Sequence, residues 1–261
     1  MNLDLTGKTA IVCGSTQGLG YASAAELALL GCHVILMARN REKLLEAVQS
    51  LSTKGGQNHG YIVADFTDTV AVKNVIDEFT KTNTVHILVN NTGGPAAGPA
   101  LTATDNEFIA AFNNHLINNH HLTQAVVPGM KAAGFGRIIN IISTSVKIPL
   151  VGLGVSNTIR GAVASWAKTL ATELGPFGIT VNNVLPGFTK TGRADYVITK
   201  KASDTGKTEA AVLAELVAEI PAKRIGQPEE FGAVVAFLCS PAAAYVNGIN
   251  LPVDGGRLGC L

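Results

Sequence analysis

One short segment near the N-terminus constrains the fold more than any other part of the chain. An apolar run over residues 8–13 leads into the loop Gly14-Ser15-Thr16-Gln17-Gly18-Leu19-Gly20 and then into an alanine-rich helical pattern. Glycines are needed where backbone must touch a pyrophosphate, and the helix that follows offers free N–H groups and a positive dipole end. The segment therefore predicts a strand, a phosphate-binding loop and a helix; tight packing at an ordinary helix start is the alternative.

Strand-like runs recur along the chain and alternate with helical patterns. After the first run they cover residues 33–38, 60–64, 86–90, 137–142, 179–184 and 249–253. Such alternation predicts the α/β class: a single Rossmann-type doubly wound domain over residues 1–261, with a seven-stranded, mainly parallel sheet and helices on both faces. The ligand of such a sheet binds beyond the carboxyl ends of the strands.

Composition narrows the class of partner. Of the 261 residues, 47% are hydrophobic and 15% charged, which suits a large domain with both sheet faces covered. A net charge of +1 leaves no basic surface for nucleic acid and no polybasic membrane anchor, so the expected partner is a small molecule. The sequence shows no export signal, no membrane-length apolar run and no paired cysteine spacing, so we expect a cytoplasmic protein without disulfides.

Candidate ligand contacts follow the second and third strands. Arg39 lies 19 residues after Gly20, where an acidic residue would bind a ribose 2'-hydroxyl. An arginine there suits a 2'-phosphate and favours NADP(H) over NAD(H), unless it only begins the polar face of the next helix. Asp65, followed by Phe66, is expected either to bind the adenine amino group or to cap the next helix.

Two further turns suit the nicotinamide half of a dinucleotide. After the fourth strand, Asn91 and Gly93 belong to a polar, glycine-rich turn. The candidates after the sixth strand are Pro186, Gly187, Phe188, Thr189 and Thr191. Because the carboxyl ends of parallel strands share one edge of the sheet, we expect these turns to lie near the glycine loop.

Nearly the whole chain resembles the short-chain dehydrogenase/reductase family, and in particular its β-ketoacyl-carrier-protein-reductase-like members. The resemblance is carried by the glycine loop, Asn90-Asn91-Thr92-Gly93, the sequence GRIINIIS at 136–143, Pro186-Gly187 and VDGG at 253–256. It implies a single-domain Rossmann-type fold, usually tetrameric, that transfers hydride between a nicotinamide and a carbonyl or alcohol.

The active-site positions depart from the family pattern. The family's catalytic serine corresponds to Ser143, and its Tyr-x-x-x-Lys motif begins 13 residues later, at Ser156 and Arg160. Counting back 30 residues from Pro186 gives the same register, so the tyrosine and the lysine are both absent. The position of the family's assisting asparagine, 28 residues before Ser143, is His115. Milder departures are Cys13 for threonine and Thr92 for alanine.

Serine cannot simply replace tyrosine as a proton donor. A tyrosine hydroxyl lies roughly 6 Å from its Cα and a serine hydroxyl roughly 2.5 Å, a difference larger than a hydrogen bond spans. We expect Arg160 to hold the nicotinamide ribose hydroxyls without relaying protons. His115, expected to titrate near neutrality, would donate or relay the proton while Ser143 polarises the carbonyl; a structural role is the alternative. Tyr196 is a second candidate donor, or an ordinary lid residue.

A long segment before the last predicted helix is expected to be a mobile, irregular substrate lid. It covers about residues 187–222, and positions 199–208 within it are rich in Lys, Ser, Thr and Gly. Its mixed composition does not identify the substrate. The sequence also shows no paired Cys/His spacing typical of a metal site.

Two helical patterns, at 104–133 and 155–174, contain small residues that permit close contact between helices. With the resemblance, they favour a homotetramer or a homodimer; packing of the same residues on the sheet is the alternative.

Three functions are consistent with this sequence. The favoured one is an NADP(H)-dependent oxidoreductase acting on a small carbonyl or alcohol substrate through a rewritten proton-transfer site, because the glycine loop, Asn91 and Ser143 are all present. The others are a cofactor-binding but redox-silent subunit of a mixed oligomer, and non-redox chemistry on the same fold.

Overall fold

Seven parallel strands form one sheet in the order β3-β2-β1-β4-β5-β6-β7. The computed structural model describes residues 1–260. The strands are β1 (Thr9–Cys13), β2 (His33–Ala38), β3 (Gly60–Val63), β4 (Ile87–Asn90), β5 (Gly136–Ile141), β6 (Ile179–Pro186) and β7 (Asn250–Val253). The order reverses direction between β1 and β4, which places the switch point where these two strands end. This confirms the predicted doubly wound α/β domain.

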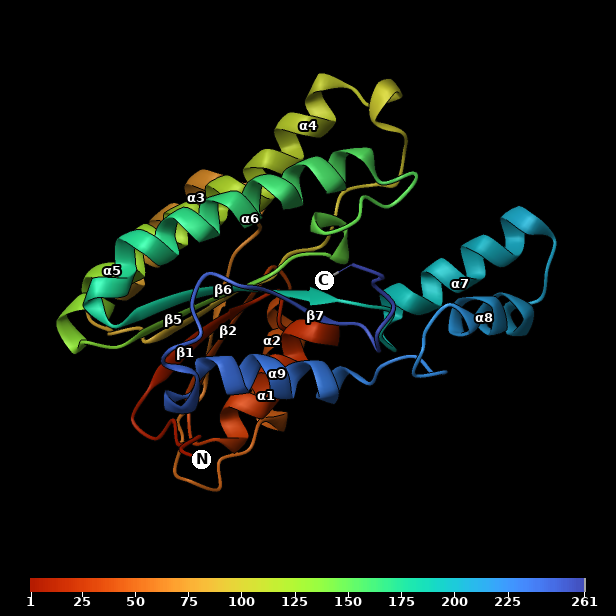
Figure 1. The fold of residues 1–261 in the computed structure, drawn as a ribbon. Coiled ribbons are helices and arrows are strands. Elements are labelled where there is room, and N and C mark those ends of the chain that lie inside the picture. Colours follow the sequence, from red (N-terminus) through yellow and green to blue (C-terminus); the bar gives the residue numbers. More distant parts are fainter. Residues whose placement is uncertain (261) are drawn as a thin grey trace.

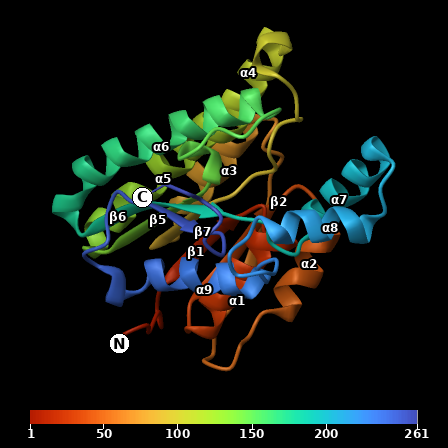
Figure 2. The same cartoon turned by 45° about the vertical axis from the view of Figure 1, so that its right-hand side comes forward.

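Helices cover both faces of the sheet (Figures 1 and 2). One face carries α1 (Gly18–Leu29), α2 (Arg41–Ser50) and α9 (Pro228–Cys239), and the other carries α3 (Thr69–Thr80), α5 (Asn118–Ala133) and α6 (Gly154–Leu174). The remaining elements are α4 (Asp105–Phe112), α7 (Gly192–Thr205), α8 (Glu209–Ala218), the short helices η1 (Ala100–Thr102), η3 (Thr144–Val146), η4 (Gly175–Phe177) and η5 (Pro241–Ala243), and a π-helical turn, η2 (Asn113–Ile117).

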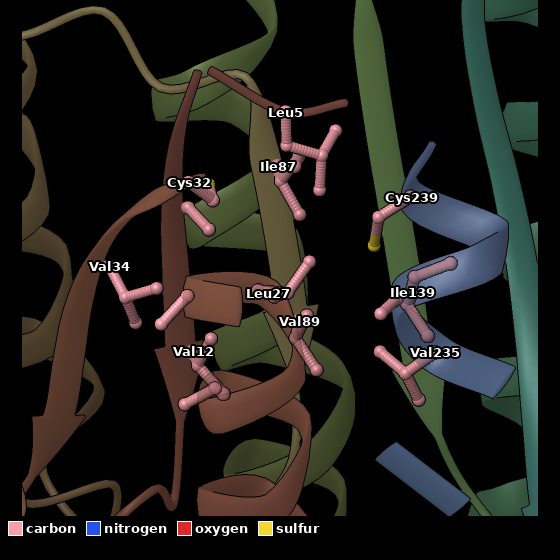
Figure 3. Packing of buried hydrophobic residues seen from close by; sticks show 14 of the residues in the cluster. Leu5, Val12, Leu27, Cys32, Val34, Ile87, Val89, Ile139, Val235 and Cys239 are labelled. Atoms are coloured by element: carbon pink, nitrogen blue, oxygen red, sulfur yellow. The ribbon is translucent and has the colours of Figure 1, made fainter. Parts of the chain in front are cut away.

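The core between the sheet and α1 and α9 is built from aliphatic side chains of the central strands. Val12, Val89 and Ile139, on β1, β4 and β5, point toward Leu27 of α1 and Val235 of α9 (Figure 3). The preceding residue on each of these strands faces the other layer, as Ile11 and Leu88 do. Strands buried on both faces read as continuous apolar runs, which is why the sequence identified them.

A row of asparagines crosses the interior of the sheet from β4 to β7. The Nδ2 of Asn90 donates to Oδ1 of Asn140 at 2.9 Å, Asn140 donates to Asn183 at 2.9 Å, and Asn183 donates to Asn250 at 2.8 Å. Strand register places each pair side by side. Because Asn140 is fully buried, its amide depends on these two partners for its hydrogen bonds. These hydrogen bonds fix the register of β4, β5, β6 and β7 relative to one another.

The predicted irregular lid is wrong in one respect, because the segment contains two helices, α7 and α8, which stand to one side of the sheet (Figures 1 and 2). Thr191 and Thr208 cap their N-termini by accepting from backbone N–H groups. Ile198 and Ala202 pack against Val212 in a small cluster of their own. The polar residues at 199–208 fall at the end of α7 and in the connection to α8, and this polarity hid the helical pattern.

The longest helix is α6, with 21 residues. Charged residues such as Arg160 and Lys168 interrupt its apolar sequence. None of the helices described for residues 1–260 combines the length and the apolar character needed to cross a membrane.

The asparagine row should contribute strongly to stability. Replacing Asn140 by alanine leaves a donor on Asn90 and an acceptor on Asn183 unpaired, so we expect the free energy of unfolding in urea to fall by about 3 kcal/mol. The control is Asn250→Ala at the exposed end of the row, where only one partner is lost and water can replace it. Equal losses in the two variants would contradict this account.

Candidate active site

At the glycine loop and the start of α1, no side chain among residues 1–260 accepts a hydrogen bond from the backbone N–H groups. Gly14 and Gly18 adopt φ of 57° and 61°, in the left-handed region that favours glycine. Gln17, which precedes α1, makes no side-chain capping hydrogen bond, and the first turn of α1 carries no acidic residue. A helix start of this kind has free donors and an uncompensated positive dipole end, which suits an anionic group.

The glycines of this loop have different roles. A Cβ on Gly20 would lie 2.3 Å from the carbonyl oxygen of Gly14 and 2.7 Å from Nδ2 of Asn91. A Cβ on Gly18 would meet only Thr191, at 3.6 Å. Gly20 is therefore required by packing within the loop.

Two residues predicted to contact the cofactor, Asn91 and Ser15, form hydrogen bonds with the protein backbone. Asn91 donates through Nδ2 to the carbonyl oxygens of Cys13, at 3.2 Å, and Gly14, at 3.1 Å. The hydroxyl of Ser15 is fully buried and accepts from the backbone N–H of Met37. Neither contact faces outward.

The loop residues available to a ligand follow from burial. Thr16 and Leu19 are half-buried, and Gln17 is exposed. Leu19 also packs against the core beneath α1. The side chains of Thr16 and Gln17 and the amides at the start of α1 therefore remain to contact a ligand.

Arg39 and Asp65 lie close together where β2 and β3 end. Hydrogen bonds from the backbone and hydroxyl of Thr67 lower the pKa of the Asp65 carboxyl, and the charge of Arg39 adds to the effect. The alternative prediction that Asp65 caps the next helix is wrong, because Asp68 accepts from Val70 and Ala71 and caps α3. Asp65 instead closes a local turn with Thr67.

Phe66 links this edge to the helix layer, because its carbonyl oxygen accepts from Nδ2 of Asn118 at 2.7 Å. Its half-buried ring packs against the core on the α3 and α5 side of the sheet. Gly93, by contrast, is exposed, and a Cβ on it would meet no atom within 4 Å.

The segment after β6 comes back over the glycine loop. Pro186 ends β6, and Gly187 fits tightly against Asp254, whose Cα would lie 2.4 Å from a Cβ at that glycine. Beyond the half-buried Phe188 and the buried Thr189, Thr191 caps α7 and places its methyl group beside Gly18. The structure therefore brings together two predicted groups of residues that are far apart in the sequence.

Ser143 follows β5, as the resemblance required. It is half-buried, and its Oγ accepts from the backbone N–H of Ser145 at 3.0 Å. This bond orients the hydroxyl and leaves its hydrogen free to donate.

Arg160 is buried on α6 with 8% of its surface exposed. It donates through Nη1 to the carbonyl oxygen of Ile141 at 3.1 Å and through Nη2 to that of Thr92 at 3.4 Å. Burial lowers the pKa of the guanidinium to about 10, so it stays charged at neutral pH. No carboxylate among residues 1–260 forms an ion pair with it. The site therefore holds a positive charge that is solvated only by backbone carbonyls.

Ser156 lies one helical turn before Arg160 on the same helix. It is half-buried, and its hydroxyl has no hydrogen-bond partner within the described part of the chain. Its role in proton transfer stays a prediction.

His115 lies in the π-helical turn η2, between α4 and α5, and is 2% exposed. Its Nδ1 is 2.5 Å from Oγ1 of Thr92. Burial and the charge of Arg160 lower the pKa of the imidazole to about 3. The expectation that His115 titrates near neutrality is therefore wrong, because a buried ring beside a cation disfavours a second positive charge. At neutral pH it is a neutral imidazole.

Tyr196 takes no part in the hydrogen bonds that connect Thr92, His115 and Arg160. It is 56% exposed on α7, and the guanidinium of Arg193 lies 5.5 Å from its ring centroid. Residues 1–260 also contain no group of three side chains placed to hold a metal ion.

Sequence reasoning missed two features of the site. The hydroxyl of Thr92 contacts His115, and the carbonyl of Thr92 accepts from Arg160, although the sequence marked Thr92 only as a mild departure. The π-helical turn was also not predicted, because a single extra residue in a helix leaves little trace in its periodicity.

Comparison with known proteins identifies the class that this fold and site define. The family model described as enoyl-(acyl carrier protein) reductase matches residues 14–257. The short-chain reductase protein NovJ of Streptomyces niveus is 34% identical over 253 residues, covering 95% of this chain and 93% of the relative. A 3-oxoacyl-(acyl-carrier-protein) reductase of Pseudomonas aeruginosa is 32% identical over 255 residues, covering 97% and 98%. The chain belongs to the short-chain dehydrogenase/reductase family of oxidoreductases.

Solved structures agree with this assignment. L-sorbose reductase of Gluconobacter frateurii, in complex with NADPH and L-sorbose, superposes with a TM-score of 0.93 at 32% identity, with 100% of both chains covered. An actinorhodin polyketide ketoreductase variant with NADPH gives 0.88 at 28% identity, with 97% of this chain and 98% of the other covered.

The pKa of His115 makes stability depend on pH. In the unfolded chain an imidazole titrates near pH 6.5, so the unfolded state binds the proton first as the pH falls. The stabilising contribution is fully present above about pH 6.5 and is lost progressively below it. Between pH 7 and pH 5 we expect the free energy of unfolding to fall by about 2 kcal/mol through this residue. Denaturant titrations of His115→Asn should lack that part of the slope; an unchanged slope would contradict the assignment.

Proposed function

We propose that this protein is an NADP(H)-dependent oxidoreductase that interconverts a small carbonyl compound and its alcohol, with a proton route that differs from the family pattern. The single observation that carries this proposal is the uncapped start of α1 behind the glycine loop, on the same sheet edge as Ser143. The reductases of similar structure were solved with NADPH, which supports the choice of cofactor.

The residues present fit a dinucleotide. The free N–H groups at the start of α1 would hold the diphosphate, with Thr16 and Gln17 beside it. Arg39, exposed at the end of β2, would pair with the 2'-phosphate of NADP(H). The N–H groups of Arg160 not used by Thr92 and Ile141 would reach the nicotinamide ribose.

The bound nicotinamide would supply or accept a hydride at the carbonyl carbon. Ser143, whose Oγ is oriented by Ser145, donates a hydrogen bond to the carbonyl oxygen, and the buried charge of Arg160 stabilises the negative charge that develops there. In the direction of reduction, that oxygen takes its proton from solvent. A water molecule held by Ser156 passes it on, because the Ser156 hydroxyl has no other partner.

His115 assists this route as a neutral group. Its pKa of about 3 prevents it from storing a proton at neutral pH. A neutral imidazole still has one N–H donor and one acceptor nitrogen, so it can orient the water that carries the proton. We propose this orienting role in place of direct donation by an imidazolium.

One observation favours a second candidate, a cofactor-binding but redox-silent subunit of a mixed oligomer. The tyrosine of the family is absent, and the pKa of His115 lies far below neutrality. Of the side chains assembled here, none is an acid with a pKa near 7. A protein that binds NADPH but turns over no carbonyl substrate would support this second function.

Measurements of NADPH binding and of carbonyl turnover distinguish the two candidate functions. We expect NADPH to bind, measured by its fluorescence, and at least one compound in a panel of oxo sugars, oxoacyl thioesters and small ketones to be reduced. Ser143→Ala should lower kcat by about 100-fold or more with little change in NADPH affinity. Ser165→Ala, exposed on α6, is the control for loss of a hydroxyl. NADPH binding without turnover refutes the oxidoreductase proposal, and failure to bind either coenzyme refutes both functions.

Cofactor choice should depend on Arg39. Removing its charge in Arg39→Ala should weaken NADPH binding by about 10-fold, while the Kd of NADH, which lacks the 2'-phosphate, changes less than about twofold. Arg41→Ala removes a neighbouring charge that contacts Tyr61 and serves as the control. Equal weakening of both coenzymes would show that Arg39 only begins the polar face of α2.

A further inference from the structure

The departures from the family pattern at positions 92, 115 and 160 meet in one set of hydrogen bonds. Thr92 Oγ1 lies 2.5 Å from Nδ1 of His115, and the carbonyl oxygen of the same threonine accepts from Nη2 of Arg160. Arg160 reaches on through Nη1 to the end of β5. Thr92 is therefore the residue that joins the histidine to the buried cation.

We propose that Thr92 is a positioning residue that fixes the tautomer and the orientation of His115, so that the imidazole presents Nε2–H to the reaction site. An alanine, usual in the family at this position, has no hydroxyl to do this. The structure thus assigns to Thr92 a part in the rewritten site that follows from the exchange at position 115.

The direction of the Thr92–His115 hydrogen bond follows from the charge nearby. Arg160 binds the carbonyl of Thr92, whose hydroxyl contacts Nδ1, and its charge acts on the imidazole; we therefore place the guanidinium on the Thr92 side of the ring. A lone pair on Nδ1 is attracted by that cation, whereas an N–H there would point its positive end at it. Thr92 Oγ1–H therefore donates to Nδ1, and the ring proton is on Nε2.

The other ring nitrogen is left free by this arrangement. Among residues 1–260, Nε2 of His115 has no hydrogen-bond partner, although the ring is 2% exposed. The extra residue of the π-helical turn displaces the backbone at this position from the regular helix on either side. A fixed Nε2–H donor in the site suits a water molecule or a substrate oxygen.

The kinetic part of this proposal rests on the proposed function, whereas the tautomer does not, so two measurements are needed. The first is nitrogen NMR of protein labelled with ¹⁵N-histidine. We expect the His115 signals of an unprotonated Nδ1 and a protonated Nε2 in the native chain, and a mixed or reversed tautomer in Thr92→Val. Native protein with the proton on Nδ1, or an unchanged tautomer in the variant, would overturn the proposal whether or not the protein is an active enzyme.

The second measurement is a double-mutant cycle on kcat and KM. Loss of the hydroxyl in Thr92→Val should lower kcat by roughly fivefold to tenfold with KM changed by less than about twofold, and Thr92→Ser should restore kcat. In the background of His115→Asn, Thr92→Val should have no further effect on kcat. Additive losses would show that Thr92 acts on kcat independently of His115 and would overturn the kinetic part.

Two further variants are included, one as a control and one as a substitute if Thr92→Val does not fold. Thr158→Val removes a hydroxyl from the exposed face of α6 that bonds only to its own helix, and it should leave kcat and the His115 signals unchanged. If Thr92→Val does not fold, Thr92→Ala, the residue usual in the family, is tested by the same two measurements, with the same outcomes deciding.

Discussion

The site depends first on two hydrogen bonds from a single amide. Nδ2 of Asn91 donates to the carbonyl oxygens of Cys13 and Gly14, and so holds the end of β1 against the end of β4. This is the point at which the strand order reverses, and the two strand ends diverge into different layers there. The asparagine row that begins at the neighbouring Asn90 extends the same restraint across β5, β6 and β7.

The electrostatics of this site are dominated by one buried positive charge. Arg160 carries its charge into the interior, where it donates to the backbone carbonyls of Ile141 and Thr92 and its charge acts on the neutral imidazole of His115. A buried cation of this kind disfavours any further positive charge nearby and stabilises negative charge that develops on a substrate oxygen. The site therefore has the means to polarise a carbonyl, while in the proposed mechanism the proton passes through hydroxyl groups and water. In the proposed register, this combination follows from the exchange of a tyrosine and a lysine for Ser156 and Arg160.

Some predictions failed for identifiable physical reasons. Asp65 and Asp68 both precede α3, and a capping residue is set by the backbone conformation at the helix start, which composition does not reveal. The end of α7 is polar because it faces solvent, and its few buried residues, such as Ile198 and Ala202, meet partners on α8 that only the tertiary structure provides. The pKa of His115 was misjudged because it depends on burial and on the position of Arg160, 45 residues further along the chain.

The sequence by itself determined the succession of the seven strands and the glycine loop, and it predicted that Ser143, Ser156 and Arg160 occupy the family's active-site positions in place of the usual tyrosine and lysine. These are local patterns, and buried strands and glycine turns leave them in the order of residues. Only the tertiary structure decided that Ser15 and Asn91 face inward, that Gly20 is required by packing, and that Thr92 joins His115 to Arg160. Those outcomes depend on distances between segments far apart in the chain, and on the burial that those segments impose on one another.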